Sequence, residues 1–172
     1  MENKNGTKIL IAVLLLVAIL CLCVAVWALF FRETVVLAPD YAPQQEEELA
    51  ETIPDDTGDK MEQPQGGGSV SLTYAREVTI DLVGETASLY FANPGRSNQD
   101  IVLQIVIQDT VVVQSGTLKP GNQVSSLNLL SGAKDQLTAG VYNGKFNVLY
   151  YDPLSGEKAI VNTEIPITIT VK

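Results

Sequence analysis

Apolar and polar residues alternate along most of the chain after residue 68. In the clearest run, residues 161–171, the odd-numbered positions hold only Val, Ile or Thr and the positions between them are mostly polar. A repeat of two residues in segments rich in β-branched side chains predicts β-strands with one face toward a core. Runs of the same kind lie at 69–74, 77–82, 87–91, 101–107, 111–113 and 142–150.

Turn-forming sequences separate these runs. Residues 93–95 and 119–122 place a proline early and a glycine or asparagine late, as β-turns prefer. Residues 152–157 join two alternating runs as a hairpin. About eight short strands of this spacing predict an all-β domain over residues 69–172, of the β-sandwich type.

A different pattern occupies the N-terminal part, where residues 9–31 contain neither a charge nor a proline. A helix of this length rises about 34 Å at roughly 1.5 Å per residue, enough to cross a hydrocarbon core of about 30 Å. Trp27, Phe30 and Phe31 gather at its end, and aromatic side chains prefer the membrane interface. The run therefore predicts a single transmembrane helix, with these three residues as interface anchors.

The charges on either side of the run predict its orientation. Lys4 and Lys8 precede it, whereas acidic residues dominate the sequence after Arg32. The positive-inside bias places residues 1–8 in the cytoplasm and the C-terminal domain outside the cell membrane. A cleaved signal peptide is the alternative, with residues 26–28 as a poor cleavage site.

Residues 32–68 differ from the rest in composition. Between residues 38 and 68 lie nine acids and one base, Lys60, so this segment carries −8 of the net charge of −9. Four prolines interrupt it and three glycines end it. High charge with few large apolar residues predicts a disordered linker that acts as a stalk. An acidic arm that binds a partner or cations is the alternative, although the spacing of a dedicated calcium loop is missing.

The residue types limit the chemistry. The chain has no histidine, and both cysteines, Cys21 and Cys23, lie in the apolar run. Ser131 and Lys134 stand three residues apart, but in a predicted loop without a nucleophile motif around it, and no Gly-x-Ser-x-Gly or phosphate-loop signature is present. We therefore expect no enzyme activity, no cofactor and no metal site. A pI near 4.4 argues against nucleic acid as a partner, because phosphates require clustered Lys and Arg.

Residues 137–142 have the form Leu-x-x-Gly-x-Tyr of a tyrosine corner, given by Leu137, Gly140 and Tyr142. In that motif the tyrosine hydroxyl bonds to the backbone a few residues upstream. With the hairpin and the last strand, residues 69–172 resemble immunoglobulin-like or fibronectin-III-like domains of bacterial surface proteins. The resemblance implies a β-sandwich and assigns no functional residue, because such domains serve many roles.

Two of the predicted strands are apolar on both faces, although the outer face of a sandwich normally meets water. We expect a candidate interface there, formed by Val102, Val106, Leu149 and Tyr151 together with Ile160, which faces outward on the next strand. The alternative is scattered surface residues or a loop folded over them. Pro166, inside the last run, indicates either a sheet edge or a strand that crosses between sheets.

These patterns predict a non-catalytic interaction or structural module of the cell envelope. Its expected partners are the membrane and either another envelope protein or a second copy of the chain. One alternative is an accessory subunit of a membrane complex for secretion, transport or conjugation. Another is a carbohydrate-binding surface domain, for which Tyr90 and Tyr151 are the aromatic candidates.

Overall fold

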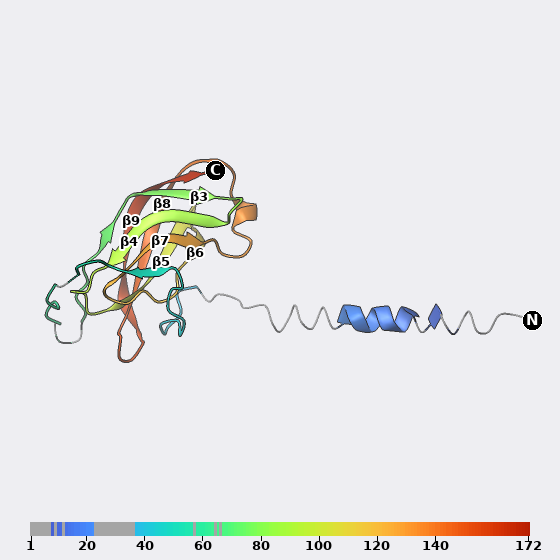
Figure 1. The fold of residues 1–172 in the computed structure, drawn as a ribbon, viewed down its shortest axis with the longest axis horizontal. Helices are drawn as coiled ribbons and strands as arrows, with labels where there is room; N and C mark the ends of the chain where they lie inside the picture. The colour runs from blue at the N-terminus through green and yellow to red at the C-terminus, as the bar shows by residue number, and fades with distance from the viewer. Residues whose placement is uncertain are drawn as a thin grey trace, which may run out of the picture. The chain divides into compact units, whose positions relative to one another are not determined.

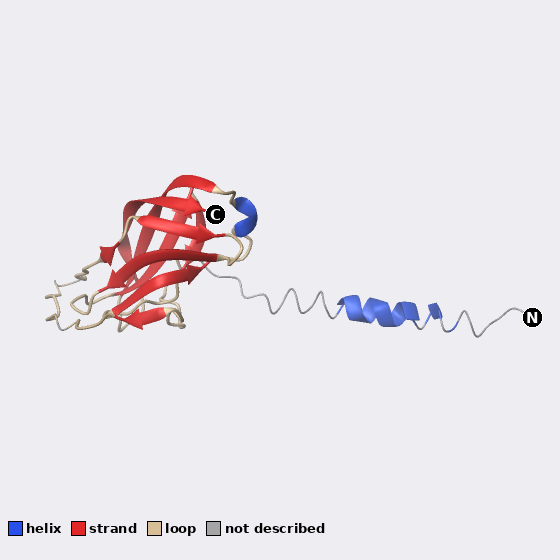
Figure 2. Cartoon of the chain, turned by 45° about the horizontal axis from the view of Figure 1, so that its top comes forward, coloured by secondary structure: helices blue, strands red, loops and turns tan. Residues whose placement is uncertain are grey.

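The computed structural model describes residues 8, 10–11, 13–22, 37–56, 58–63, 65 and 67–172. The chain divides into two compact units, Met1–Val35 and Val36–Lys172. In the first unit the described residues are helical and exposed (Figure 2). Much of the predicted span, with Trp27, Phe30 and Phe31, lies outside the described residues. Within the described part, no helix combines the length and the apolar character needed to cross a membrane.

The second unit consists mainly of strands (Figure 1). The prediction of a mostly β fold is confirmed for this unit. A single short 3-10 helix, η1 (Lys134–Gln136), accompanies the strands of its described residues. The strands are β1 (Ala50–Thr52), β2 (Thr73–Tyr74), β3 (Glu77–Asp81), β4 (Thr86–Asn93), β5 (Asp100–Ile107), β6 (Thr110–Gln114), β7 (Asn122–Asn128), β8 (Gly140–Tyr151) and β9 (Lys158–Val171).

The strands form one curled, mixed sheet. Its order is β1-β7-β4-β3-β9-β8-β5-β6, with β2 paired to β4. The pair β3–β9 is parallel and the other pairs are antiparallel. The sheet curls until β6 meets the end of β7, where the Leu130 N–H donates to the Val112 carbonyl at 2.9 Å. The inner face of the curl is therefore enclosed.

The main core fills this inner face. Along β9, Ile165, Ile167, Ile169 and Val171 are buried while the residues between them are mostly exposed, which is the alternation seen in the sequence. Phe91 of β4 packs edge-on against Phe146 of β8, with ring centroids 5.4 Å apart. Residues from strands far apart in the sheet order thus meet across one core.

The prediction of a disordered linker is wrong for the described part of residues 32–68. Residues 37–53, which we call the strap, belong to the second unit, so the compact unit begins well before residue 69. Within the strap, β1 pairs with the start of β7. Further along, the Met61 N–H donates to the Arg96 carbonyl at 2.8 Å. The acids predicted disorder, but most of them stay exposed while the backbone between them finds partners on the sheet.

Candidate functional site

Four of the five predicted interface residues are buried: Val102 and Tyr151 are 0% exposed, Leu149 5% and Val106 7%. Val102, Leu149 and Tyr151 form a second apolar cluster on the outer face of β5 and β8, apart from the main core. Two small side chains of the strap, at positions 38 and 42, pack against this cluster. The alternative of a chain segment folded over these residues therefore holds for this face. The prediction of an exposed interface there is wrong.

Tyr151 lies at the centre of the covered cluster. Its hydroxyl donates to the Pro39 carbonyl at 3.0 Å, across 112 residues of sequence. Burial raises the pKa of Tyr151 to about 12, and the nearby Asp40 carboxylate adds to the effect. The hydroxyl therefore stays protonated and keeps its donor at neutral pH. A charge introduced at Tyr151 would disrupt packing and would not report on docking.

Backbone groups along the strap are bonded one after another to the sheet. The Ala42 N–H donates to the Gly156 carbonyl at 2.7 Å, and Thr117 Oγ1 donates to the Pro43 carbonyl at 2.9 Å. The Glu47 carboxylate accepts the Gly116 N–H at 2.7 Å. These bonds satisfy strap groups that would otherwise lose water on contact with the sheet.

Charged side chains gather where the strap passes β5. Lys119 forms an exposed ion pair with Glu46 of the strap at 2.5 Å, and this hydrogen bond raises the pKa of Lys119. Nearby, Asp100 is 8% exposed. Burial raises the pKa of the Asp100 carboxyl, and the Lys119 charge opposes that rise. An exposed pair of this kind contributes little to stability.

Ile160, the fifth predicted residue, lies elsewhere and is fully exposed. Leu149 pairs with Asn162 and Tyr151 with Lys158, so three residues of β9, including Ile160, stand opposite one residue of β8. The extra residues form a bulge, which bends the strand locally and increases its twist. The predicted interface therefore separates into a covered cluster and an uncovered residue on a bulged strand.

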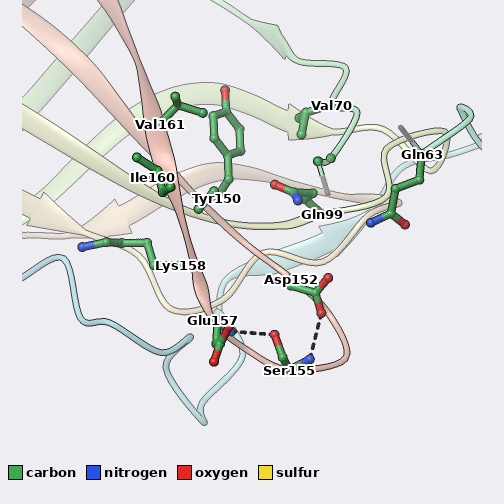
Figure 3. A pocket seen from close by; sticks show the side chains of 13 residues that line it. Gln63, Val70, Gln99, Tyr150, Asp152, Ser155, Glu157, Lys158, Ile160 and Val161 are labelled. Carbon is green, nitrogen blue, oxygen red and sulfur yellow. Dashed lines mark hydrogen bonds between the residues drawn. The ribbon is translucent and has the colours of Figure 1, made fainter. Parts of the chain in front are cut away.

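The bulge borders a cavity of about 700 Å³ (Figure 3). Figure 3 shows Ile160, Val161 and Tyr150 on one side of the view and Val70, Gln99 and Gln63 on the other. The hairpin that joins β8 to β9 closes one end. The described lining residues are Gln63, Gly67, Gly68, Val70, Gln99, Tyr150, Asp152, Ser155, Glu157, Lys158, Ala159, Ile160 and Val161.

The cavity wall is apolar along β9 and charged at the hairpin. Ile160 is fully exposed and Val161 is 69% exposed. Asp152 accepts the N–H groups of Leu154 and Ser155, at 2.9 and 2.8 Å, which holds its carboxyl pKa below the usual value. Asp152 is therefore anionic at neutral pH.

The lysine at the hairpin is already occupied by the strap. Lys158 Nζ donates to the Ala38 carbonyl at 3.1 Å and lies 3.9 Å from the Asp40 carboxylate. Its charge is therefore shared with the strap, whereas Glu157 beside it forms no ion pair among the described residues. The hairpin end of the cavity thus presents negative charge.

Sequence reasoning missed the cavity and most of its lining. The turn sequence at 152–157 located the hairpin, but nothing in the sequence placed Gln99 and Val70 opposite it. Tyr150 is 8% exposed, with its hydroxyl donating to Thr163 Oγ1 at 2.6 Å, and burial raises its pKa. Because Tyr150 is buried and its hydroxyl is already bonded to Thr163, it contributes to the cavity as part of the wall.

The remaining predicted residues lie outside the cavity. Leu137 is 9% exposed, and the Tyr142 hydroxyl donates to the Thr138 carbonyl at 2.9 Å, four residues upstream. Tyr90 is 38% exposed with its hydroxyl on Gln123, whereas Tyr151 is buried, so the two do not form an aromatic platform. Among the residues that the structure describes, no group of three or more acidic or cysteine side chains is placed to hold a metal ion.

Comparison with known proteins adds little to this picture. No protein-family model matches the chain, and no curated protein matches it. Among solved structures it is similar to AggA, the major subunit of aggregative adherence fimbriae type I from Escherichia coli. The identity is 13%, the match covers 65% of this chain and 100% of that chain, and the TM-score is 0.29. A likeness this distant carries no argument about function.

Proposed function

We propose that the chain is a non-catalytic, membrane-anchored interaction or structural module whose β domain lies outside the cell membrane. One observation carries the binding role: exposed Ile160 and Val161 line an open cavity on a domain that covers its other outer apolar face with its own strap. Uncovered apolar residues beside a cavity are typical of surfaces that bind other molecules.

The membrane anchor and the orientation rest on the sequence. Residues 9–31 are apolar and uncharged, basic residues precede them, and acidic residues follow. These features support a cytoplasmic N-terminus and an extracytoplasmic domain. The domain contains no cysteine, so it depends on no disulfide in that compartment.

We also propose that the curled sheet is an immunoglobulin-like or fibronectin-III-like sandwich. In this interpretation β7-β4-β3 and β9-β8-β5-β6 are two layers, linked by the parallel pair β3–β9. The contact of Phe91 with Phe146 supports two facing layers. The Tyr142 hydrogen bond to Thr138 supports a tyrosine corner at the start of β8.

A labelling experiment tests the anchor and the orientation. Leu154, which is 97% exposed in the β8–β9 hairpin, is replaced by cysteine in a full-length chain whose Cys21 and Cys23 are alanine. In spheroplasts of a bacterial host we expect a membrane-impermeant maleimide to label Leu154→Cys. The matched control, Thr7→Cys, should be labelled only after lysis. The proposal would be contradicted if intact spheroplasts protected both cysteines equally from the maleimide, or if washing released the chain from the membranes.

A further inference from the structure

One edge of β9 is largely unpaired. β8 covers the other edge along the strand, whereas on this edge β3 pairs only with Thr168–Val171 among the described residues. The Lys158 N–H, at the other end, donates to the Asp40 carbonyl of the strap. Between these two points, the described part of the chain supplies no strand partner to this edge of β9.

The hydrogen bonds at the end of β9 show which backbone groups face the open edge. The N–H groups of Thr168 and Lys172 donate toward β3, to the carbonyls of Arg76 and Ile80. Backbone groups of alternate residues point to the same side of a strand. Asn162, Glu164 and Pro166 therefore direct their backbone polar groups to the open edge.

Pro166 has a defined place on this edge. It lacks an N–H where a further neighbouring strand would need a donor, which is where proline is tolerated in a sheet. The bulge near Ile160 limits the edge at the other end. The open edge therefore offers the N–H groups of Asn162 and Glu164 and nearby carbonyls, a length that suits a short segment.

The cavity adjoins this edge. Ile160 and Val161 belong to both, and Val70 lies across the cavity from them in Figure 3. A strand added to β9 at Asn162 would continue into the cavity and bury these apolar side chains. The carboxylates of Asp152 and Glu157 stand at the hairpin end of the same cavity.

We propose that β9 binds an extended peptide from a partner protein by strand addition, with apolar side chains at alternate positions and a basic group at the end near the hairpin. The backbone bonds would come from the open edge, the apolar contacts from Ile160 and Val161, and the charge complementarity from Asp152 and Glu157. This inference rests on the binding role proposed above and names the partner of that site.

A second copy of the chain fits this edge less well than a basic peptide. Each copy carries a net charge of −9, so two copies repel. Each would also bring its own bulge and Pro166 to the contact, which shortens any ladder between two β9 edges. A basic partner is attracted by the same charges.

The test uses the full-length chain in detergent and a phage-displayed library of random decapeptides. Enriched peptides are synthesised with a fluorescent label, and binding is measured by anisotropy. Glu164→Pro removes the open-edge N–H, and Glu164→Ala removes the same side chain, with its ion pair to Lys145, but keeps that N–H. We expect Glu164→Pro to weaken binding at least tenfold relative to Glu164→Ala.

A second pair of variants tests the charge complementarity between the cavity and the peptide, and it leaves the backbone hydrogen-bonding groups of β9 unchanged. Val161 is exposed, so Val161→Arg and Val161→Glu should both fold as the wild type does. We expect Val161→Arg to weaken binding at least tenfold relative to Val161→Glu, because it places a positive charge beside the basic end of the peptide. This pair decides the result if Glu164→Pro fails to fold.

The outcomes separate strand addition from the proposed membrane anchor and orientation. Absence of enriched peptides, or equal binding to both members of the folded pairs, would overturn strand addition. Concentration-dependent dimers of the wild type that Glu164→Pro abolishes would make a second copy the occupant and would also overturn it. Neither result affects the maleimide labelling, which tests the anchor and the orientation independently.

Discussion

Two apolar surfaces outside the main core differ in whether the chain covers them. Val102, Leu149 and Tyr151 are buried beneath the strap. Ile160 and Val161, on the next strand, remain exposed beside a cavity. Tyr151 and Ile160 look alike in sequence, as apolar residues on the predicted outer side of strands, whereas Val161 belongs to the predicted inner face. A surface that the protein covers with its own segment is part of its interior, and one that it leaves open beside an unpaired edge is available to another molecule.

Truncating one residue from each surface should give the largest contrast. Tyr151→Ala removes a buried aromatic ring and its bond to Pro39, so we expect the free energy of unfolding to fall by about 3–5 kcal/mol. Ile160→Ala removes a side chain that is already in water, and we expect a change within about 0.5 kcal/mol. Urea unfolding of both variants measures the difference. Similar losses would mean that the strap does not cover Tyr151.

Displacing the strap without touching the cluster should have the next largest effect. A Cβ at Gly116 would lie 2.9 Å from both the Gln45 carbonyl oxygen and the Glu47 nitrogen, so Gly116→Ala forces the strap away. We expect a loss of about 1–3 kcal/mol, as for other overpacked contacts. Gly58→Ala is the control, because its Cβ would make only ordinary contact with Arg96.

Hydrogen exchange shows whether the loss at Gly116 comes from the strap. The Glu47 N–H donates to the Thr117 carbonyl in the wild type, so its exchange should accelerate in Gly116→Ala. The amides of β9 should keep their protection. Uniform acceleration over the whole sheet would contradict a local effect on the strap.

A smaller change isolates the hydrogen bond beneath the strap. Tyr151→Phe keeps the ring and removes the hydroxyl that donates to Pro39, so a half-buried carbonyl loses its partner. We expect a loss of about 1 kcal/mol, measured by thermal or urea unfolding. As a comparison, Tyr142→Phe removes the exposed bond to Thr138, where water takes the place of the hydroxyl, and should cost less. A neutral Tyr151→Phe would mean that water replaces the bond and that the strap fits loosely.

The smallest predicted effect is a pH dependence at Asp100, beside the ion pair of the strap. Burial raises its folded pKa above 3.8, so the unfolded chain releases this proton first as the pH rises. Stability due to this group therefore falls between pH 3.8 and the raised pKa. We expect Asp100→Asn to gain stability relative to wild type over that window and to keep the gain at neutral pH. Unfolding from acid to neutral pH measures this difference, and the opposite trend would contradict it.

The alternation of β9 shows how far local sequence predicts the fold. The odd positions of residues 161–171 predicted one buried face, and Ile165 to Val171 have that face against the core. The reason is that a strand repeats every two residues whatever it packs on. The bulge near Ile160 was not predictable in the same way, because it depends on the register with β8.

The acidic segment shows where composition misleads. Its charges and prolines predicted disorder, yet β1 pairs with β7, and Glu46 pairs with Lys119. The cavity was equally hidden, since it brings Val70, Gln99 and Ile160 together from separate parts of the chain. In both cases the deciding contacts join residues that the sequence keeps far apart.

The sequence by itself determined the strand-forming character of the domain, the apolar N-terminal run and the absence of histidine chemistry. Only the tertiary structure decided that Tyr151 is covered and Ile160 is open. The physical reason is that burial is a relation between segments, and the segment that buries Tyr151 lies 112 residues away at Pro39. Local periodicity shows which apolar side chains share a face, and the packing of distant segments decides which of these side chains become buried.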